Sequence, residues 1–136
     1  MADLQPLSAA LEALLAGVSA LKAESVPLET AGGRVLAEAV TAQLDVPPFD
    51  NSAMDGYVLR AADAGKWLPV SQRIAAGTPA QALAPGSCAR IFTGGEIPLG
   101  ANCVVMQERV EVDGERALIP EDIPAGDNVR RKGRDV

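Results

Sequence analysis

The chain has 136 residues, of which 48% are hydrophobic and 3% aromatic, and its formal net charge is −6. This length suits one domain with at most a small appendage, and the hydrophobic content excludes intrinsic disorder. The acidic charge argues against nucleic acid as the main partner, because basic surfaces bind phosphate groups. No apolar run approaches the roughly 20 residues that span a bilayer, so no membrane partner is expected.

The first predicted element is an amphipathic helix over Ser8–Ala23. Ser8 is a plausible N-cap, because its hydroxyl can accept a hydrogen bond from an early backbone N–H. Apolar side chains recur every three or four residues, as on one face of a helix; they are Leu7, Leu11, Leu14, Leu15, Val18 and Leu21. We expect this face to pack in a core, and the alternative is a helix that docks onto a partner.

Residues 24–48 are predicted to connect this helix to the rest of the chain. The glycine pair at 32–33 interrupts the segment, and we expect a short helix around Gly32–Ala37 and a strand near Val40–Ala42. Pro47 and Pro48 fix two φ angles and lack N–H donors, so they form a stiff extended link. We place a boundary there, with an N-terminal segment over residues 1–45 and a second domain over residues 46–136.

The second domain is predicted to be compact, mostly β and barrel-like. Short apolar runs alternate with Gly and Pro, as in small all-β folds; the runs lie at residues 57–59, 68–70, 73–74, 88–92, 103–106, 109–112 and 117–119. Asp113-Gly114, between the last two runs, indicates a hairpin turn. Together with the N-terminal helix, these strands give an α+β fold class.

The two cysteines, Cys88 and Cys103, are predicted to be buried, reduced thiols. The chain has no histidine and no CxxC spacing, which argues against a zinc site and excludes a Ser–His or Cys–His catalytic pair. The first residues do not read as a signal peptide, so we expect a cytoplasmic location.

Three polar segments could carry chemistry. The first, DNSAMDGY at residues 50–57, holds two carboxylates, an amide and a hydroxyl directly after the prolines. It could be a capped loop or a helix start. However, Asp55-Gly56 at the edge of a strand is also suited to aim a carboxylate at a ligand.

The second segment leads from a predicted strand through Thr93 into Gly94-Gly95. Glycine N–H groups and a Thr hydroxyl can bind an anion, and a plain β-turn is the alternative. The third segment, DNVRRKGRD at residues 127–135, concentrates basic residues. Its arginines could bind an oxyanion bidentately, or they could belong to a solvated terminus.

Taken in order, these segments resemble the molybdopterin molybdenumtransferase family, which includes the E domain of gephyrin. PPFDNSAMDGY at residues 47–57 closely matches the signature loop of that family. Further matches are GRVLA at 33–37, IFTGG at 91–95 with Pro98 and Gly100, ANCVVMQE at 101–108 and NVRRKGRD at 128–135. Arg134 is a departure, since the family commonly has an acidic residue there.

The resemblance implies an enzyme that inserts molybdenum from molybdate into adenylylated molybdopterin with the help of Mg²⁺. It implies catalytic and substrate-binding residues but no metal ligand in this chain; the catalytic residues are Asp55, Thr93 and Asp135, and the substrate-binding residues are Ser52, Arg130 and Arg131. A Thr hydroxyl could donate to an oxo group, and arginines could offset the charge of an anionic substrate. Asp55, an anion near anions, would act through a cation, a proton or water.

The same resemblance implies that residues 1–45 help to form a homodimer and that the mobile β domain faces the substrate domain of the other subunit. The substrate-binding α/β domain of the family comes later in the chain, so residues 1–136 alone are expected to be inactive. A molybdopterin adenylyltransferase is the expected pathway partner. Two alternatives stay open: a stand-alone interaction or scaffold module of the same fold, and a small oxyanion-binding β protein.

Overall fold

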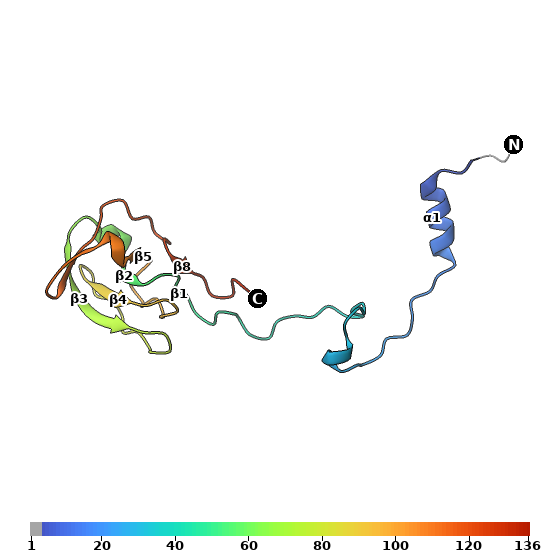
Figure 1. The fold of residues 1–136 in the computed structure, drawn as a ribbon, viewed down its shortest axis with the longest axis horizontal. Coiled ribbons are helices and arrows are strands. Elements are labelled where there is room, and N and C mark those ends of the chain that lie inside the picture. The colour runs from blue at the N-terminus through green and yellow to red at the C-terminus, as the bar shows by residue number, and fades with distance from the viewer. Residues whose placement is uncertain (1–3) are drawn as a thin grey trace. The chain divides into compact units, whose positions relative to one another are not determined.

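A computed structural model describes residues 4–136. The chain divides into two units, Met1–Thr41 and Ala42–Val136. Within residues 4–41, the first unit contains one α-helix, α1 (Leu7–Ala16), and one turn of 3-10 helix at Leu28–Thr30 (Figure 1). The predicted roles of residues 1–45 and 46–136 as separate domains stay predictions.

Helix α1 is shorter than predicted and is capped by different residues. Pro6, not Ser8, is the N-cap, and Gly17 ends the helix. Glycine inside a helix is less favourable than alanine by about 1 kcal/mol. Because packing does not offset this cost at Gly17, the helix ends there. No residue of α1 is buried, and Leu14 has 72% of its surface exposed. The expected packing of this face in the core of the chain is therefore wrong.

Two further predictions for the connecting segment are wrong. The short helix around Gly32–Ala37 is replaced by a turn in which Gly33 has φ +77°, an angle that a right-handed helix excludes. Val40–Ala42 forms no strand, because no described strand lies beside it for pairing. Among residues 4–136, no helix is long and apolar enough to cross a membrane.

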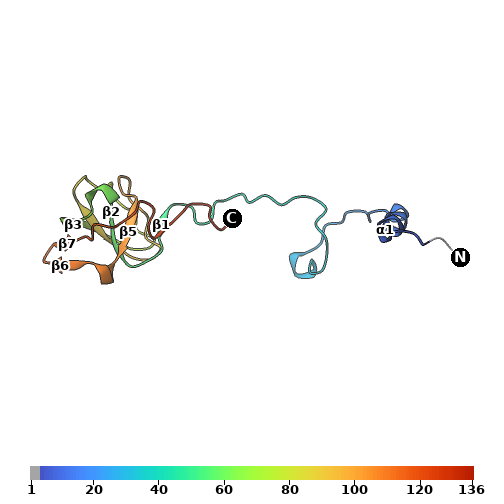
Figure 2. The same ribbon diagram turned by 90° about the horizontal axis from the view of Figure 1, so that it is seen from above.

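The second unit is built on a six-stranded sheet that curls into a half-barrel, in the order β5–β2–β4–β3–β7–β6. The strands are β2 (Gly56–Leu59), β3 (Trp67–Ile74), β4 (Cys88–Ile91), β5 (Cys103–Met106), β6 (Glu111–Asp113) and β7 (Arg116–Leu118). All neighbours are antiparallel except β3 and β4, and Figure 2 shows β3, β7 and β6 gathered at one side. The mostly β, barrel-like expectation and the α+β class are confirmed.

The central strands β2, β4 and β5 are buried on both faces, because alternate residues enter two separate cores. Tyr57 and Leu59 of β2 join one cluster, whereas Val58 joins the other. A register shift between Val70 and Arg73 in β3 reverses the alternation, so Arg73 comes to pair with Arg90 of β4.

The predicted hairpin and the predicted thiols are both confirmed. Asp113 pairs with Arg116 across β6 and β7, so the two loop residues are Gly114-Glu115, one position later than expected. Cys88 and Cys103 are free and buried. Burial is the main cause that raises the pKa of each thiol to about 11, so both stay protonated at neutral pH.

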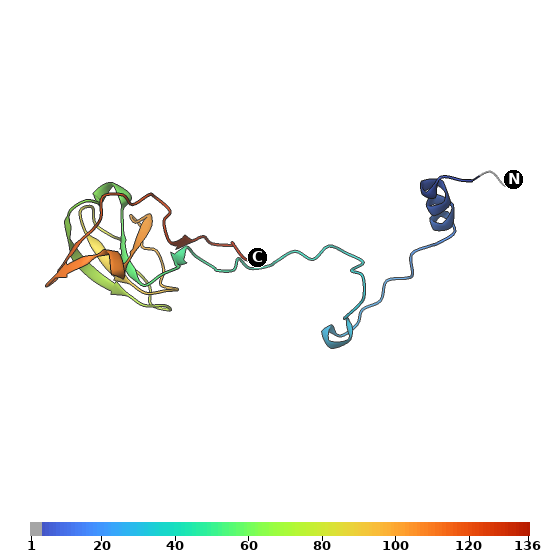
Figure 3. The same cartoon turned by 45° about the horizontal axis from the view of Figure 1, so that its top comes forward.

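The two ends of the second unit run side by side as a ribbon, here called the terminal ribbon (residues 45–52 and 129–136). Strands β1 (Asn51–Ser52) and β8 (Val129–Arg130) pair antiparallel (Figure 3). Backbone bonds continue the pairing: the Asp135 N–H donates to Val46 C=O at 2.9 Å, and the Gly133 N–H donates to Pro47 C=O at 2.9 Å. The Val46–Pro47 peptide bond is cis. The predicted double-proline link is therefore one half of a two-stranded connection.

Candidate active site

The structure brings Asp55 and Thr93 into direct contact. Asp55 lies between β1 and β2, and Thr93 follows β4. The backbone N–H and the hydroxyl of Thr93 both donate to Asp55 Oδ1, each at 2.8 Å. The Asp55 side chain is exposed, and no group of residues 4–136 donates to its second oxygen, Oδ2. One carboxylate oxygen is thus fixed while the other is open to solvent.

The contact with Thr93 also sets the charge of Asp55. The Thr93 N–H and then the Thr93 hydroxyl lower the pKa of this carboxyl below its usual range, and the charge of Arg90 adds to the effect. Asp55 is therefore ionised at neutral pH. It can accept a proton or attract a cation, but it is not a proton donor there.

The glycine turn after Thr93 is occupied by protein contacts. The Gly94 N–H donates to Ser52 C=O at 2.8 Å, and the Gly95 N–H donates to Phe92 C=O at 2.8 Å. With the Thr93 N–H already bonded to Asp55, these three N–H groups have protein acceptors. The plain β-turn, rather than the anion-binding turn, describes the segment.

Ser52 holds the signature loop together from inside. Its side chain is buried with 1% exposed surface, and its hydroxyl donates to Met54 C=O at 2.5 Å. Its N–H donates to Gly95 C=O at 2.9 Å. Ser52 therefore ties the signature loop to the Thr93 turn, and its predicted contact with substrate stays a prediction.

The basic C-terminal residues are ordered in the terminal ribbon and are partly neutralised there. Arg130 pairs with Asp135. Arg131 pairs with Asp50 at 2.6 Å, and the Lys132 side chain pairs with Asp45 at 3.0 Å. The sequence did not indicate these two pairs, because Asp45 and Asp50 each lie more than 80 residues before their partners in the chain. The substrate-binding roles of Arg130 and Arg131 and the catalytic role of Asp135 stay predictions.

Asp50 is expected to make the terminal ribbon sensitive to acid. The Lys132 N–H donates to Asp50 Oδ1 at 2.8 Å and, with Arg131, lowers the pKa of this carboxyl against the opposing effect of burial. Stability from a lowered pKa is present above the unfolded value of about 4 and is lost as pH falls through the folded value. We expect Asp50→Asn to reduce the free energy of unfolding at pH 7 by about 1 kcal/mol or less.

Urea unfolding at pH 7 and at pH 2 measures this effect. The difference between the wild type and Asp50→Asn should shrink at the lower pH, where the wild-type carboxyl becomes protonated. Asp122→Asn, which removes an exposed carboxylate outside the terminal ribbon, is the control. A difference that stays constant between the two pH values would contradict the assignment.

The described residues do not form a self-sufficient site for the Mg²⁺ that the resemblance implies. Within residues 4–136, no three carboxylate, thiol or imidazole groups lie close enough to hold a metal ion. Asp55 Oδ2 could supply a single ligand, whereas Mg²⁺ needs near-octahedral oxygen coordination.

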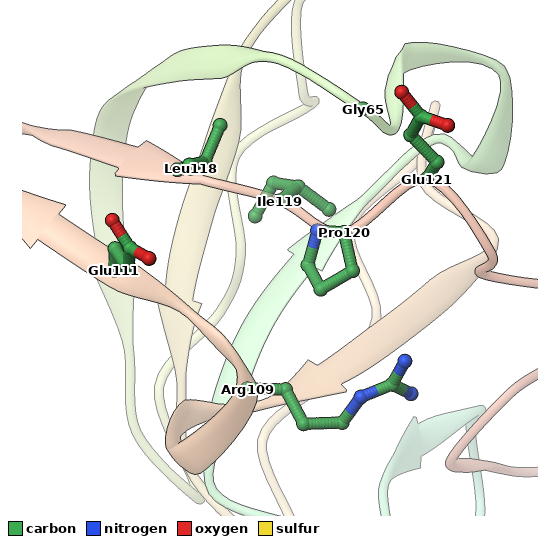
Figure 4. Close-up of a pocket in the computed structure, with 7 residues that line it drawn as sticks. All are labelled: Gly65, Arg109, Glu111, Leu118, Ile119, Pro120 and Glu121. Atoms are coloured by element: carbon green, nitrogen blue, oxygen red, sulfur yellow. The ribbon is translucent and has the colours of Figure 1, made fainter.

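A hollow of about 340 Å³ lies elsewhere on the second unit (Figure 4). Arg109, Glu111 and Glu121 are among its lining residues, and none of the predicted site residues is. Arg109 is already paired with Asp122 at 3.0 Å. The candidate site is the exposed Asp55–Thr93 pair, which lies away from this hollow.

Together, these features define a small half-barrel β domain that displays a carboxylate–hydroxyl pair and whose two ends leave side by side. The sequence matches the family described as MoeA N-terminal region (domain I and II) over residues 5–136. The chain therefore belongs to this family.

Curated relatives and a solved structure agree with this assignment. The molybdopterin molybdenumtransferase of Synechococcus elongatus is 39% identical over 140 residues, which cover 95% of this chain and 35% of the relative. That of a Nostoc species is 43% identical over 117 residues, which cover 80% of this chain and 27% of the relative. The crystal structure of a molybdopterin biosynthesis MoeA protein from Pyrococcus horikoshii OT3 aligns with a TM-score of 0.79 and 38% identity, over 98% of this chain and 38% of that one. The chain spans about a third of the length of these relatives.

Proposed function

We propose that this chain is the N-terminal part of a molybdopterin molybdenumtransferase, which inserts molybdenum from molybdate into adenylylated molybdopterin. The observation that carries the proposal is the Asp55–Thr93 pair: both residues lie in segments that resemble the family's motifs, and Thr93 donates two hydrogen bonds to Asp55. An exposed pair with one open oxygen is suited to close over a substrate held by another domain.

In this proposal the chain acts on its substrates through charge and position. Asp55 Oδ2 accepts a proton or attracts a cation while Oδ1 stays fixed by Thr93. Because the Thr93 hydroxyl is committed to Asp55, it orients the carboxylate and is not free to donate to molybdate in this arrangement. The remaining parts of the polypeptide bind the anionic substrate, and the closing wall excludes water.

The partners follow from the same proposal. The exposed leucine face of α1 would be covered in a homodimer, and a molybdopterin adenylyltransferase would supply the adenylylated substrate in the cytoplasm. Mg²⁺ would be bound mostly by groups outside this chain.

Molybdenum insertion measured with the complete polypeptide tests the proposal. We expect transfer of molybdenum to molybdopterin when molybdate and adenylylated molybdopterin are both supplied, and none from residues 1–136 alone, because this segment has only one wall of the site. A folded, complete polypeptide without activity would contradict the proposal and would favour the scaffold alternative. Activity in residues 1–136 alone would contradict the division of the site between domains.

A further inference from the structure

Arg90 of β4 contacts the backbone on both sides of the candidate site. Its Nη1 donates to Gly56 C=O at 2.7 Å and to Ile91 C=O at 3.1 Å. Gly56 directly follows Asp55, and Ile91 lies two residues before Thr93. One guanidinium nitrogen therefore joins the start of β2, directly after Asp55, to the end of β4, two residues before Thr93.

The other terminal nitrogen of Arg90 closes a ring of contacts. Nη2 donates to Gln107 Oε1, and the Gln107 N–H donates to Asp55 C=O at 3.1 Å. The end of β5 is thereby tied to the same two strands. The path runs from Asp55 through Gln107 and Arg90 to Gly56, and it returns to Asp55 along the chain.

Two aromatic rings hold the guanidinium in place. Its Cζ lies 4.5 Å from the centre of the Phe92 ring and 5.4 Å from that of Tyr57. Among residues 4–136 Arg90 has no ion-pair partner. Its hydrogen bonds are directed at backbone and amide oxygens, and its charge acts on Asp55, whose pKa it helps to lower.

We propose that Arg90 is a positioning residue that keeps Asp55 and Thr93 paired. A planar guanidinium can satisfy several oxygens in fixed directions at once, which an ammonium group cannot do. Without it, the ladder that pairs Gly56 with Ile91 remains, but the side-chain ties to Gly56, Ile91 and Gln107 are lost, and the Asp55 carboxylate is held less firmly at its two Thr93 donors. The claim concerns the pairing itself; its importance for catalysis rests on the proposed function.

Nuclear magnetic resonance of the 136-residue chain can follow the pairing directly. The Thr93 amide proton donates to the Asp55 carboxylate, so its chemical shift should titrate with that carboxyl. The test compares Arg90→Gln, Arg90→Lys and Arg116→Gln with the wild type. Arg116 is the matched control, because it also lies over an aromatic ring, with its Cζ 5.7 Å from the centre of the Trp67 ring, and it lies on β7.

We expect Arg90→Gln to raise the Asp55 pKa toward its ordinary value, to weaken the titration of the Thr93 amide and to speed its hydrogen exchange roughly tenfold, the loss of about one charged hydrogen bond. Core amides such as that of Val104 should exchange as in the wild type. Arg90→Lys keeps the positive charge but lacks the planar guanidinium fork. Its Asp55 pKa should therefore lie close to the wild-type value, whereas its Thr93 amide should still exchange faster than in the wild type. Arg116→Gln should change neither signal.

A folded Arg90→Gln chain with wild-type Asp55 and Thr93 signals would overturn the proposal. If Arg90→Gln does not fold, Arg90→Lys provides the test. Wild-type hydrogen exchange at the Thr93 amide of this variant would overturn the role of the planar guanidinium. Faster exchange in a folded chain would support it. In the complete polypeptide, Arg90→Lys should lower kcat more than it changes KM. If the resonance results hold but the wild-type polypeptide has no activity, the proposed function fails and the positioning role stands.

Discussion

Under the proposed function, replacing Asp55 by Asn is expected to slow molybdenum insertion by the complete polypeptide by about 100-fold or more, the lower range for removal of a positioned acid–base group. Asn has nearly the same shape, and its carbonyl oxygen can still accept the two bonds from Thr93. It lacks the negative charge and the basic second oxygen. The loss should therefore appear in kcat, with the fold of the second unit unchanged.

The control for this prediction is Asp122→Asn. Asp122 is an exposed carboxylate that pairs with Arg109 at 3.0 Å, so its loss changes the net charge equally but leaves the candidate site intact. Its insertion rate should match the wild type. An Asp55→Asn enzyme with wild-type kcat would remove Asp55 from the mechanism.

A double-mutant cycle adds a second test of the same pair. If Thr93 acts by orienting Asp55, then Thr93→Val should cost activity in the wild type but little more in the Asp55→Asn background. Thr93→Ser keeps the hydroxyl and should stay close to wild type. Additive losses would show that Thr93 acts on the substrate independently of Asp55.

The β unit was predictable because its signals are local. Short apolar runs, such as residues 103–106, became strands, and Asp113-Gly114 marked a hairpin within one residue. What could not be predicted was the pairing order, in which parallel β3 and β4 lie inside an otherwise antiparallel sheet. That order depends on contacts between distant residues, which no short sequence pattern specifies.

The N-terminal unit was predicted less well, for a related reason. The leucine spacing correctly indicated a helix, but an apolar face specifies only that something should cover it, not what. The helix ends at Gly17 because no packing offsets the low helix propensity of glycine there. Helix and strand predictions at residues 32–42 failed where neither periodicity nor a partner strand supported them.

The candidate site shows the same division between local and distant information. Asp55 and Thr93 could each be singled out from their own segments. Only the structure shows that they touch each other. The same holds for the Ser52 hydroxyl, which bonds within the signature loop, and for the hydrogen bonds of Arg90 to the neighbouring backbone. Arg90 occupies an ordinary strand position between two apolar residues, so the sequence carries no mark of its role.

Gly56 is the residue whose replacement should destabilise the second unit most. A Cβ at this position would lie 1.9 Å from Val105 O and 2.8 Å from Val105 C, both backbone atoms of the neighbouring strand β5. Backbone atoms cannot move aside as a flexible side chain does. We therefore expect Gly56→Ala to separate β2 from β5 and to reduce the free energy of unfolding by about 3 kcal/mol or more, the upper range for overpacking.

Urea unfolding of Gly56→Ala, with Gly114→Ala as the matched control, measures this effect. Gly114 has φ +57° in the hairpin turn and no atom within 4 Å of an added Cβ, so its replacement should cost only the conformational strain of about 1 kcal/mol. The gap between the two variants isolates the steric contribution at Gly56. Because Gly56 C=O also accepts the Arg90 bond, Gly56→Ala should disturb the Thr93 amide as Arg90→Gln does. A Gly56→Ala chain as stable as the Gly114→Ala chain would mean that β2 and β5 are not packed as closely as described.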